Sequence, residues 1–184
     1  MTKFALLLST VCLAAGLASA AEPPAPTVAK LFDSQLAGVE KEVVSLAEAM
    51  PEEQYNFAPT QGAFEGVRTF AQQAKHIAIT NYEMASVVLG EKMTLEVGPQ
   101  ENGPEAIRTK AEIVKFLKDS YAYCHKAEKS LTKDNLTDMV DGGDGHKVPR
   151  GLYANLAIWH SYDHYGQMVE YARMNHVIPP ASRK

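Results

Sequence analysis

Apolar residues recur every three to four positions in four separate stretches of the chain, which is the period of an amphipathic α-helix. The first stretch ends at Met50, where Pro51 stops a helix. The second runs from about Val67 to Leu89 and is followed by Gly90, a residue suited to a helix C-terminus. The pattern therefore predicts helices over about 28–50, 67–89, 109–131 and 149–175.

Long, turn-rich connections separate these predicted helices. Gly, Pro, Asn and Asp gather at residues 98–104 and 141–145, and residues 109–112 have the Thr-x-x-Glu pattern of a capping box. We find no strand pattern and no internal repeat. The predicted fold class is therefore all-α, a four-helix bundle with long loops. Such loops permit parallel as well as antiparallel neighbours, so spacing alone does not fix the winding.

The first 20 residues have the features of a secretory signal peptide. Lys3 gives a short basic start, an apolar run follows, and Ala18-Ser19-Ala20 matches the cleavage pattern of small residues. Cleavage is predicted near Ala20/Ala21, which places the chain in the periplasm or outside a bacterial cell. The predicted divisions are a signal peptide over 1–20, a Pro-rich extended leader over 21–26 and one bundle domain over 27–184.

Removal of this segment changes the charge and the cysteine content. Lys3 and Cys12 leave with it, so the formal net charge moves from -4 to -5 and Cys124 remains as a lone cysteine without a disulfide partner. A lipid anchor on Cys12 is disfavoured, because Val11 is too large for the position before a lipidated cysteine. The apolar run is shorter than the roughly 20 residues that span a bilayer, so no stable membrane insertion is expected. The absence of a basic stripe argues against nucleic acid as a partner.

Two histidines one helical turn apart, His160 and His164, form half of a candidate metal site. Residues i and i+4 share one face of a helix, so both rings can reach the same ion. A third ligand must come from another helix, and His76 is the best candidate. The alternative is that each histidine is an ordinary core or surface residue. Ser161 follows His160, so the Glu of the HExxH motif is missing and a zinc protease of that class is disfavoured.

Four segments, in this order, carry a resemblance to a known family. They are EQYNFAPT at 53–60, HIA at 76–78 with NY at 81–82 and GEK at 90–92, His160 with HYGQ at 164–167, and VIPP at 177–180. Together they resemble the DinB family of bacterial four-helix-bundle proteins over most of the mature chain. The resemblance implies an up-down-down-up winding and a divalent metal ion held by three histidines. Those positions are filled here by His76, His160 and His164.

One position departs from this family pattern. His176 stands where a glycine is usual in the closing turn. Asn175 tolerates a left-handed conformation, and a histidine suits the negative end of a helix. We interpret the departure as local and do not assign His176 as a further metal ligand.

Three neutral imidazoles leave coordination positions open, which is typical of a catalytic metal ion. Water would fill the open position, and Zn²⁺ can lower the pKa of that water to about 7, while Ni²⁺, Fe²⁺ and Mn²⁺ also accept imidazole ligands. Gln167 and Thr80 are candidates to hydrogen-bond the outer ring nitrogens. Asp163 and Glu83 are candidate general bases, and the alternative for each is an ordinary surface carboxylate.

Members of the DinB family act as metal-dependent hydrolases or as transferases that use low-molecular-weight thiols, and many members have no known reaction. Export disfavours the thiol-dependent transferase, because such thiols are kept reduced inside the cell. The leading hypothesis is an exported metal-dependent hydrolase with a metal-bound water as nucleophile and a small-molecule substrate. The competing hypothesis is a non-enzymatic metal-binding or stress-response protein. Exposed residues of the first helix and the long loops are compatible with a homodimer.

Overall fold

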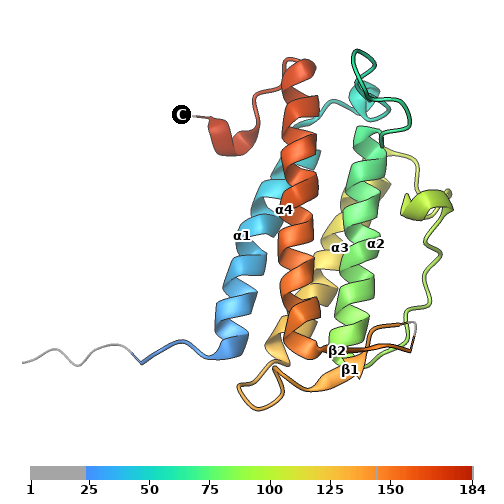
Figure 1. The fold of residues 1–184 in the computed structure, drawn as a ribbon. Coiled ribbons are helices and arrows are strands. Elements are labelled where there is room, and N and C mark those ends of the chain that lie inside the picture. Colours follow the sequence, from blue (N-terminus) through green and yellow to red (C-terminus); the bar gives the residue numbers. More distant parts are fainter. Residues whose placement is uncertain (1–23, 144, 184) are drawn as a thin grey trace, which may run out of the picture.

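The computed structural model describes residues 24–143 and 145–183, most of which lie in four α-helices (Figure 1). The helices are α1 Val28–Ala49, α2 Phe70–Leu89, α3 Lys110–Lys129 and α4 Arg150–Met174. Three short 3-10 helices lie outside them, η1 Glu52–Gln54, η2 Pro99–Glu101 and η3 Pro180–Ser182. The all-α bundle predicted from the apolar period is confirmed.

Side-chain caps set the first residues of α2 and α3. The Thr69 hydroxyl accepts the backbone N–H of Gln72, and the Gln72 side chain accepts the backbone N–H of Thr69. The same reciprocal arrangement starts α3 at Thr109, as the sequence predicts. Helix α2 begins at Phe70 and not near Val67, because this first capping box, which the apolar period does not reveal, ends the extended segment before it.

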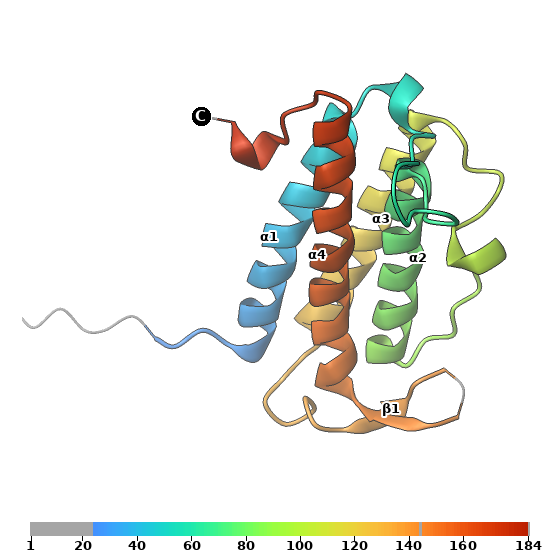
Figure 2. The same ribbon diagram turned by 45° about the horizontal axis from the view of Figure 1, so that its top comes forward.

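The bundle has the up-down-down-up winding (Figures 1 and 2). Helices α1 and α4 run in one direction, and α2 and α3 run in the opposite direction. Helix α2 packs against α3 and α4, and α1 packs against the same two helices, so α1 and α2 are diagonal across the bundle. The connection 90–109 returns along α2 and allows α3 to lie parallel to it. Helices α2 and α4 are therefore antiparallel neighbours whose middle turns can face each other.

The apolar faces of all four helices meet in one core. Its largest fully buried apolar side chains include Leu36, Leu46, Phe70, Ile77, Ile113, Leu117, Tyr121 and Met168. Cys124 is also buried there, and its thiol donates to the carbonyl of Asn81 at 3.2 Å. Burial raises the pKa of this thiol well above its usual value, which fits a packing role for Cys124.

A short antiparallel hairpin precedes α4 and was not predicted. Strand β1 Met139–Asp141 pairs with β2 Lys147–Pro149, with Val140 opposite Val148. Each strand has three residues, which is too short for the two-residue alternation to be recognised in the sequence. The prediction that the chain contains no strand is therefore wrong at this place.

Helix α4 ends in a turn whose left-handed residue is His176. The φ angle is -101° at Asn175 and 60° at His176. The N–H of Val177 donates to the carbonyl of Ala172 and the N–H of His176 to that of Arg173, which are the two bonds of a Schellman motif. The conformation that glycine favours thus falls on His176 itself and not on Asn175.

The predicted signal peptide over 1–20 and the first part of the leader over 21–26 lie outside the described residues, so both assignments stay predictions. Residues 24–27 enter α1 without regular secondary structure, and Thr27 caps that helix. Among the described helices, none combines the length and the apolar character needed to cross a membrane.

Candidate metal centre

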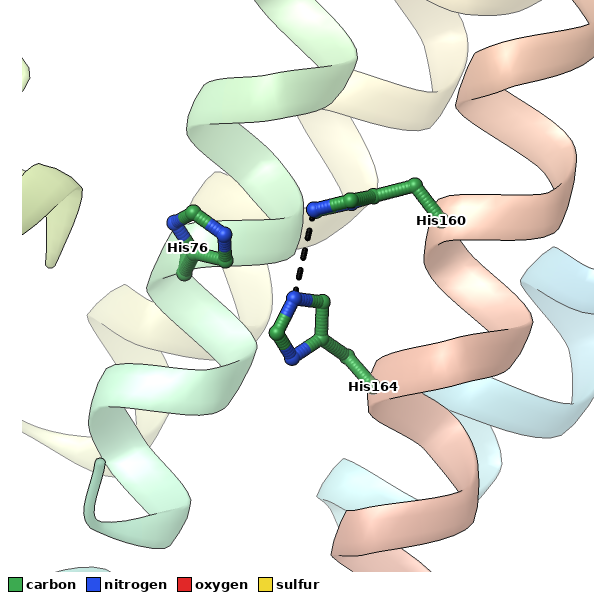
Figure 3. A group of neighbouring side chains, drawn as sticks. All are labelled: His76, His160 and His164. Atoms are coloured by element: carbon green, nitrogen blue, oxygen red, sulfur yellow. Dashed lines mark hydrogen bonds between the residues drawn. The ribbon is translucent and has the colours of Figure 1, made fainter. Parts of the chain in front are cut away.

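Three histidine rings converge between α2 and α4 (Figure 3). His76 on α2 and His160 and His164 on α4 each offer a ring nitrogen, and these nitrogens all lie within 4.8 Å of one another. The Nε2 atoms of His160 and His164 are 3.2 Å apart. Two nitrogens bound to one Zn²⁺ at about 2.0–2.1 Å in tetrahedral geometry lie about 3.3 Å apart. The spacing of the α4 pair therefore suits a shared metal ion.

Helix geometry and helix packing account for this convergence. His160 and His164 are one turn apart on the same face of α4. His76 lies on the side of α2 that packs against α4, and with 6% of its surface exposed it is buried. His164 is also buried, whereas His160 is partly exposed. Solvent therefore reaches the group from the side of His160.

A backbone carbonyl orients the ring of His76. Its Nδ1 lies 2.8 Å from the carbonyl oxygen of Glu101 in η2. A carbonyl oxygen only accepts, so Nδ1 carries the hydrogen and donates, which leaves the lone pair of the neutral ring on Nε2. Thr80, the predicted partner of this ring, is buried one turn further along α2, but the outer nitrogen is already bound to Glu101.

A glutamine from α2 orients the ring of His164. Its Nδ1 donates to the Oε1 atom of Gln73 at 2.5 Å, so its Nε2 also keeps a lone pair. The Nε2 group of Gln73 donates in turn to Oε1 of Gln167 at 3.0 Å. Gln167, predicted to contact a ligand ring, therefore supports the site through Gln73.

His160 is the least constrained of the three rings. Its Nδ1 atom is buried and has no hydrogen-bond partner within 24–143 and 145–183. Its Nε2 atom faces Nε2 of His164, and because that atom keeps its lone pair, the hydrogen between the two rings lies on Nε2 of His160 unless a cation replaces it. The arrangement leaves the Nε2 side of both rings for a shared cation.

Burial keeps all three imidazoles neutral at pH 7. It lowers the pKa of His76, and it lowers that of His160 to about 4 and that of His164 to about 3, where the neighbouring rings add to the effect. A neutral imidazole is the form that binds a metal ion. The residues therefore fit Zn²⁺, Ni²⁺, Fe²⁺ or Mn²⁺, and the ligand set does not select among them.

The two candidate general bases lie in different places. Asp163 is exposed on α4, and its charge acts on His160 in the direction that raises the pKa of that ring, against the larger effect of burial. Glu83 is half-buried two turns after His76, and burial raises the pKa of its carboxyl group. It lines a cavity of about 480 Å³ between the end of α2 and the β1–β2 hairpin. In the described parts of the chain, neither carboxylate is hydrogen-bonded to the three rings, so both catalytic roles stay predictions.

Gln73 and Glu101 are the orienting residues that the sequence pattern did not identify. Gln73 stands three positions before His76 and shares its helix face, which is a signal that both ligand helices should be searched for acceptors. Glu101 acts through its backbone carbonyl, and a carbonyl is present at every residue. Its role therefore has no sequence signal.

The chain resembles known proteins in sequence and in fold. A family model, the DinB superfamily, matches residues 35–168. A solved DinB-like protein from Bacillus cereus gives a TM-score of 0.64 at 19% identity, covering 81% of this chain and 93% of that one. A conserved protein from Enterococcus faecalis gives 0.64 at 17%, covering 82% and 98%, and a DinB-like protein from Bacillus subtilis gives 0.60 at 19%, covering 82% and 95%. At these identities the structural likeness concerns the fold alone, and no curated protein matches the sequence.

Proposed function

The chain belongs to the DinB superfamily, and on that premise we propose that it is an exported, divalent-metal-dependent hydrolase with His76, His160 and His164 as metal ligands. The observation that carries the proposal is the convergence of three neutral imidazoles from two helices. Three protein ligands leave a further coordination position for water or substrate. Export rests on the pattern of the first 20 residues.

Different residues of the protein orient the metal ligands, accept a proton and contact the substrate at such a site. Gln73 and the carbonyl of Glu101 hold two rings with Nε2 turned inward. A divalent ion bound there supplies Lewis-acid chemistry, either by polarising a carbonyl group or by acidifying a water molecule. We assign Asp163 as the base that accepts the proton of the attacking water, because its charge already acts on His160 at the solvent side of the group. We assign Glu83, in the cavity wall, to contact with the substrate.

Metal content and turnover of the purified mature chain test this function. We expect one ion per chain, exchangeable water on that ion, and hydrolysis of at least one member of a panel of small esters and amides. His160→Ala should remove both the ion and the activity. His146→Ala, which changes an exposed histidine of the hairpin connection, should remove neither. Asp163→Asn should lower turnover while the ion stays bound.

Three results would contradict the hydrolase. The first is a chain without a stoichiometric ion, and the second is turnover that survives His160→Ala. The third is a tightly held ion with no exchangeable water and no turnover, which would identify a metal-binding protein without catalysis.

A further inference from the structure

The loop that faces His76, residues 98–103, has a backbone that ordinary residues rarely adopt; we call it the η2 loop. The φ angles of Gln100 and Glu101 are 55° and 58°, in the left-handed region that side chains disfavour. Gly98 and Gly103 have φ angles of 69° and 78°, and a Cβ on Gly98 would clash with the backbone of Gly103. Such a conformation persists only when its surroundings hold it in place.

Helix α2 and the residue just before its cap hold this loop. The Nε group of Arg68 donates to Oδ1 of Asn102, and its Nη2 group donates to the carbonyl of Gln100, both at 2.8 Å. Lys75 donates to the carbonyl of Pro104 at 3.1 Å. A Cβ on Gly103 would lie 2.8 Å from the Cβ of Lys75, so the loop backbone lies directly on the helix.

Between Gln100 and Asn102, the two loop residues that Arg68 binds, one backbone carbonyl of the loop contacts His76. Glu101 follows Gln100, and its oxygen accepts the Nδ1 hydrogen of His76. A hydrogen bond at the outer nitrogen fixes both the tautomer and the direction of a ligand ring. We propose that the η2 loop is a positioning element for the ligand His76 and that Arg68 is the positioning residue that locks it. The proposal rests on the three-histidine metal site proposed above.

If Arg68 acted only through its charge, its removal would change metal-ion affinity in the opposite direction from the loss of a positioning residue. Its positive charge contributes to the lowered pKa of all three histidines, so it is close enough to act on a cation held between them. Charge alone would repel a divalent ion, and removing Arg68 would then tighten metal binding. If Arg68 acts by holding the loop, its removal weakens metal binding. The sign of the change therefore separates the two roles.

The test is the dissociation constant of Zn²⁺, measured by competition with a chelator. We expect Arg68→Ala to weaken binding by about tenfold, the size usual for the loss of an outer-shell partner. Arg68→Lys keeps the charge but loses the planar fork that reaches two acceptors, so it should also weaken binding. Arg108→Ala is the matched control, because Arg108 donates to the carbonyl of Glu105 in the same connection, outside the η2 loop. Unchanged or tighter binding by Arg68→Ala would overturn the proposal.

A second variant keeps the test decisive if Arg68→Ala folds poorly without metal. Gln100→Gly retains the carbonyl that Arg68 binds and suits the φ angle of 55°. It should bind Zn²⁺ at least as tightly as the wild type and raise the melting temperature of the metal-free chain. Weaker Zn²⁺ binding by Gln100→Gly would contradict the positioning role.

Wild type and His160→Ala are measured in the same series. A wild-type chain that binds no Zn²⁺ would contradict the proposed metal site itself. Wild-type binding that His160→Ala abolishes and Arg68→Ala leaves unchanged would contradict the positioning role alone.

Discussion

Two glutamines support the ring of His164, and only one of them is hydrogen-bonded to it. Gln73 accepts the Nδ1 hydrogen at 2.5 Å, whereas Gln167 bonds to Gln73. We expect Gln73→Leu to weaken Zn²⁺ binding by about 10-fold to 100-fold, because the ring loses the acceptor that fixes its tautomer. Gln167→Leu should cost less than about threefold, since Gln73 keeps its bond to the ring. Chelator competition measures both, and equal losses would contradict this order.

Gln73 and Gln167 also show how much of the site sequence spacing can predict at the residue scale. Spacing on α4 indicates the two candidate ligands and places Gln167 on their face, but it contains no information about which neighbouring helix supplies the acceptor. Gln73 is 91 positions before His164, and only the packing of α2 on α4 brings them together. The candidate ligands follow from residue type and spacing, whereas their hydrogen-bond partners depend on tertiary contacts.

Glu128 gives the fold a pH dependence of its own. It is 1% exposed, and its Oε2 atom has no hydrogen-bond partner in the described part of the chain. Burial, with a smaller contribution from the charge of Asp33, raises the pKa of its carboxyl group from 4.5 to about 8. The folded chain thus holds this proton more tightly than the unfolded chain does. The contribution to stability is complete below pH 4.5 and is lost as the pH rises through 8.

Glu128→Gln tests this assignment because glutamine resembles the protonated carboxyl group. Its advantage over the wild type in the free energy of unfolding should grow between pH 5 and pH 9 and reach a few kcal/mol, about 1.4 for each pKa unit. Urea unfolding at a series of pH values measures it. Glu105→Gln, at an exposed site, is the control that should show no such trend. A difference that stays constant with pH would refute the raised pKa.

At the scale of elements, the turn that ends α4 contains a strained residue whose replacement should stabilise the fold. His176 occupies the left-handed position of a Schellman motif, where a Cβ is unfavourable. We expect His176→Gly to raise the free energy of unfolding by about 1 kcal/mol, measured by urea unfolding. Asn175→Gly is the matched control, because Asn175 has a φ of -101° and gains nothing from glycine. A loss of stability in His176→Gly would mean that the imidazole makes a larger contribution at this helix end than the backbone strain removes.

The element boundaries show where the apolar period is sufficient and where it fails. It locates all four helices, and the Thr-x-x-Glu signal places the start of α3 correctly at Thr109. The predicted start of α2 is wrong, because the cap of this helix uses Gln72 with Thr69, and neither residue belongs to the apolar pattern. The β1–β2 hairpin was missed because three-residue strands have too few positions to show alternation. Local hydrogen bonds therefore determine where a helix begins, while the pattern of buried apolar residues determines which segments form helices.

At the scale of the whole molecule, the winding is the part that spacing alone left open. Connections over 50–69, 90–109 and 130–149 are each long enough to reverse the chain or to return it to the same end of the bundle. The family resemblance indicated the up-down-down-up order, and the packing of α2 on both α3 and α4 agrees with it. This winding brings the three histidines of the candidate metal centre together, because it places α2 beside α4 with their middle turns facing each other.

An ion at this place would join two helices whose ligands are 84 positions apart, His76 and His160. The unfolded chain does not hold them together, so metal binding should stabilise the folded bundle by mass action. Free Zn²⁺ at 100 times its dissociation constant should add about 2.7 kcal/mol, which corresponds to a rise in melting temperature of about 5–10 °C for a chain of this size. Thermal unfolding with and without Zn²⁺ measures the rise, and His160→Ala should abolish it. An equal rise in that variant would place the ion elsewhere on the chain.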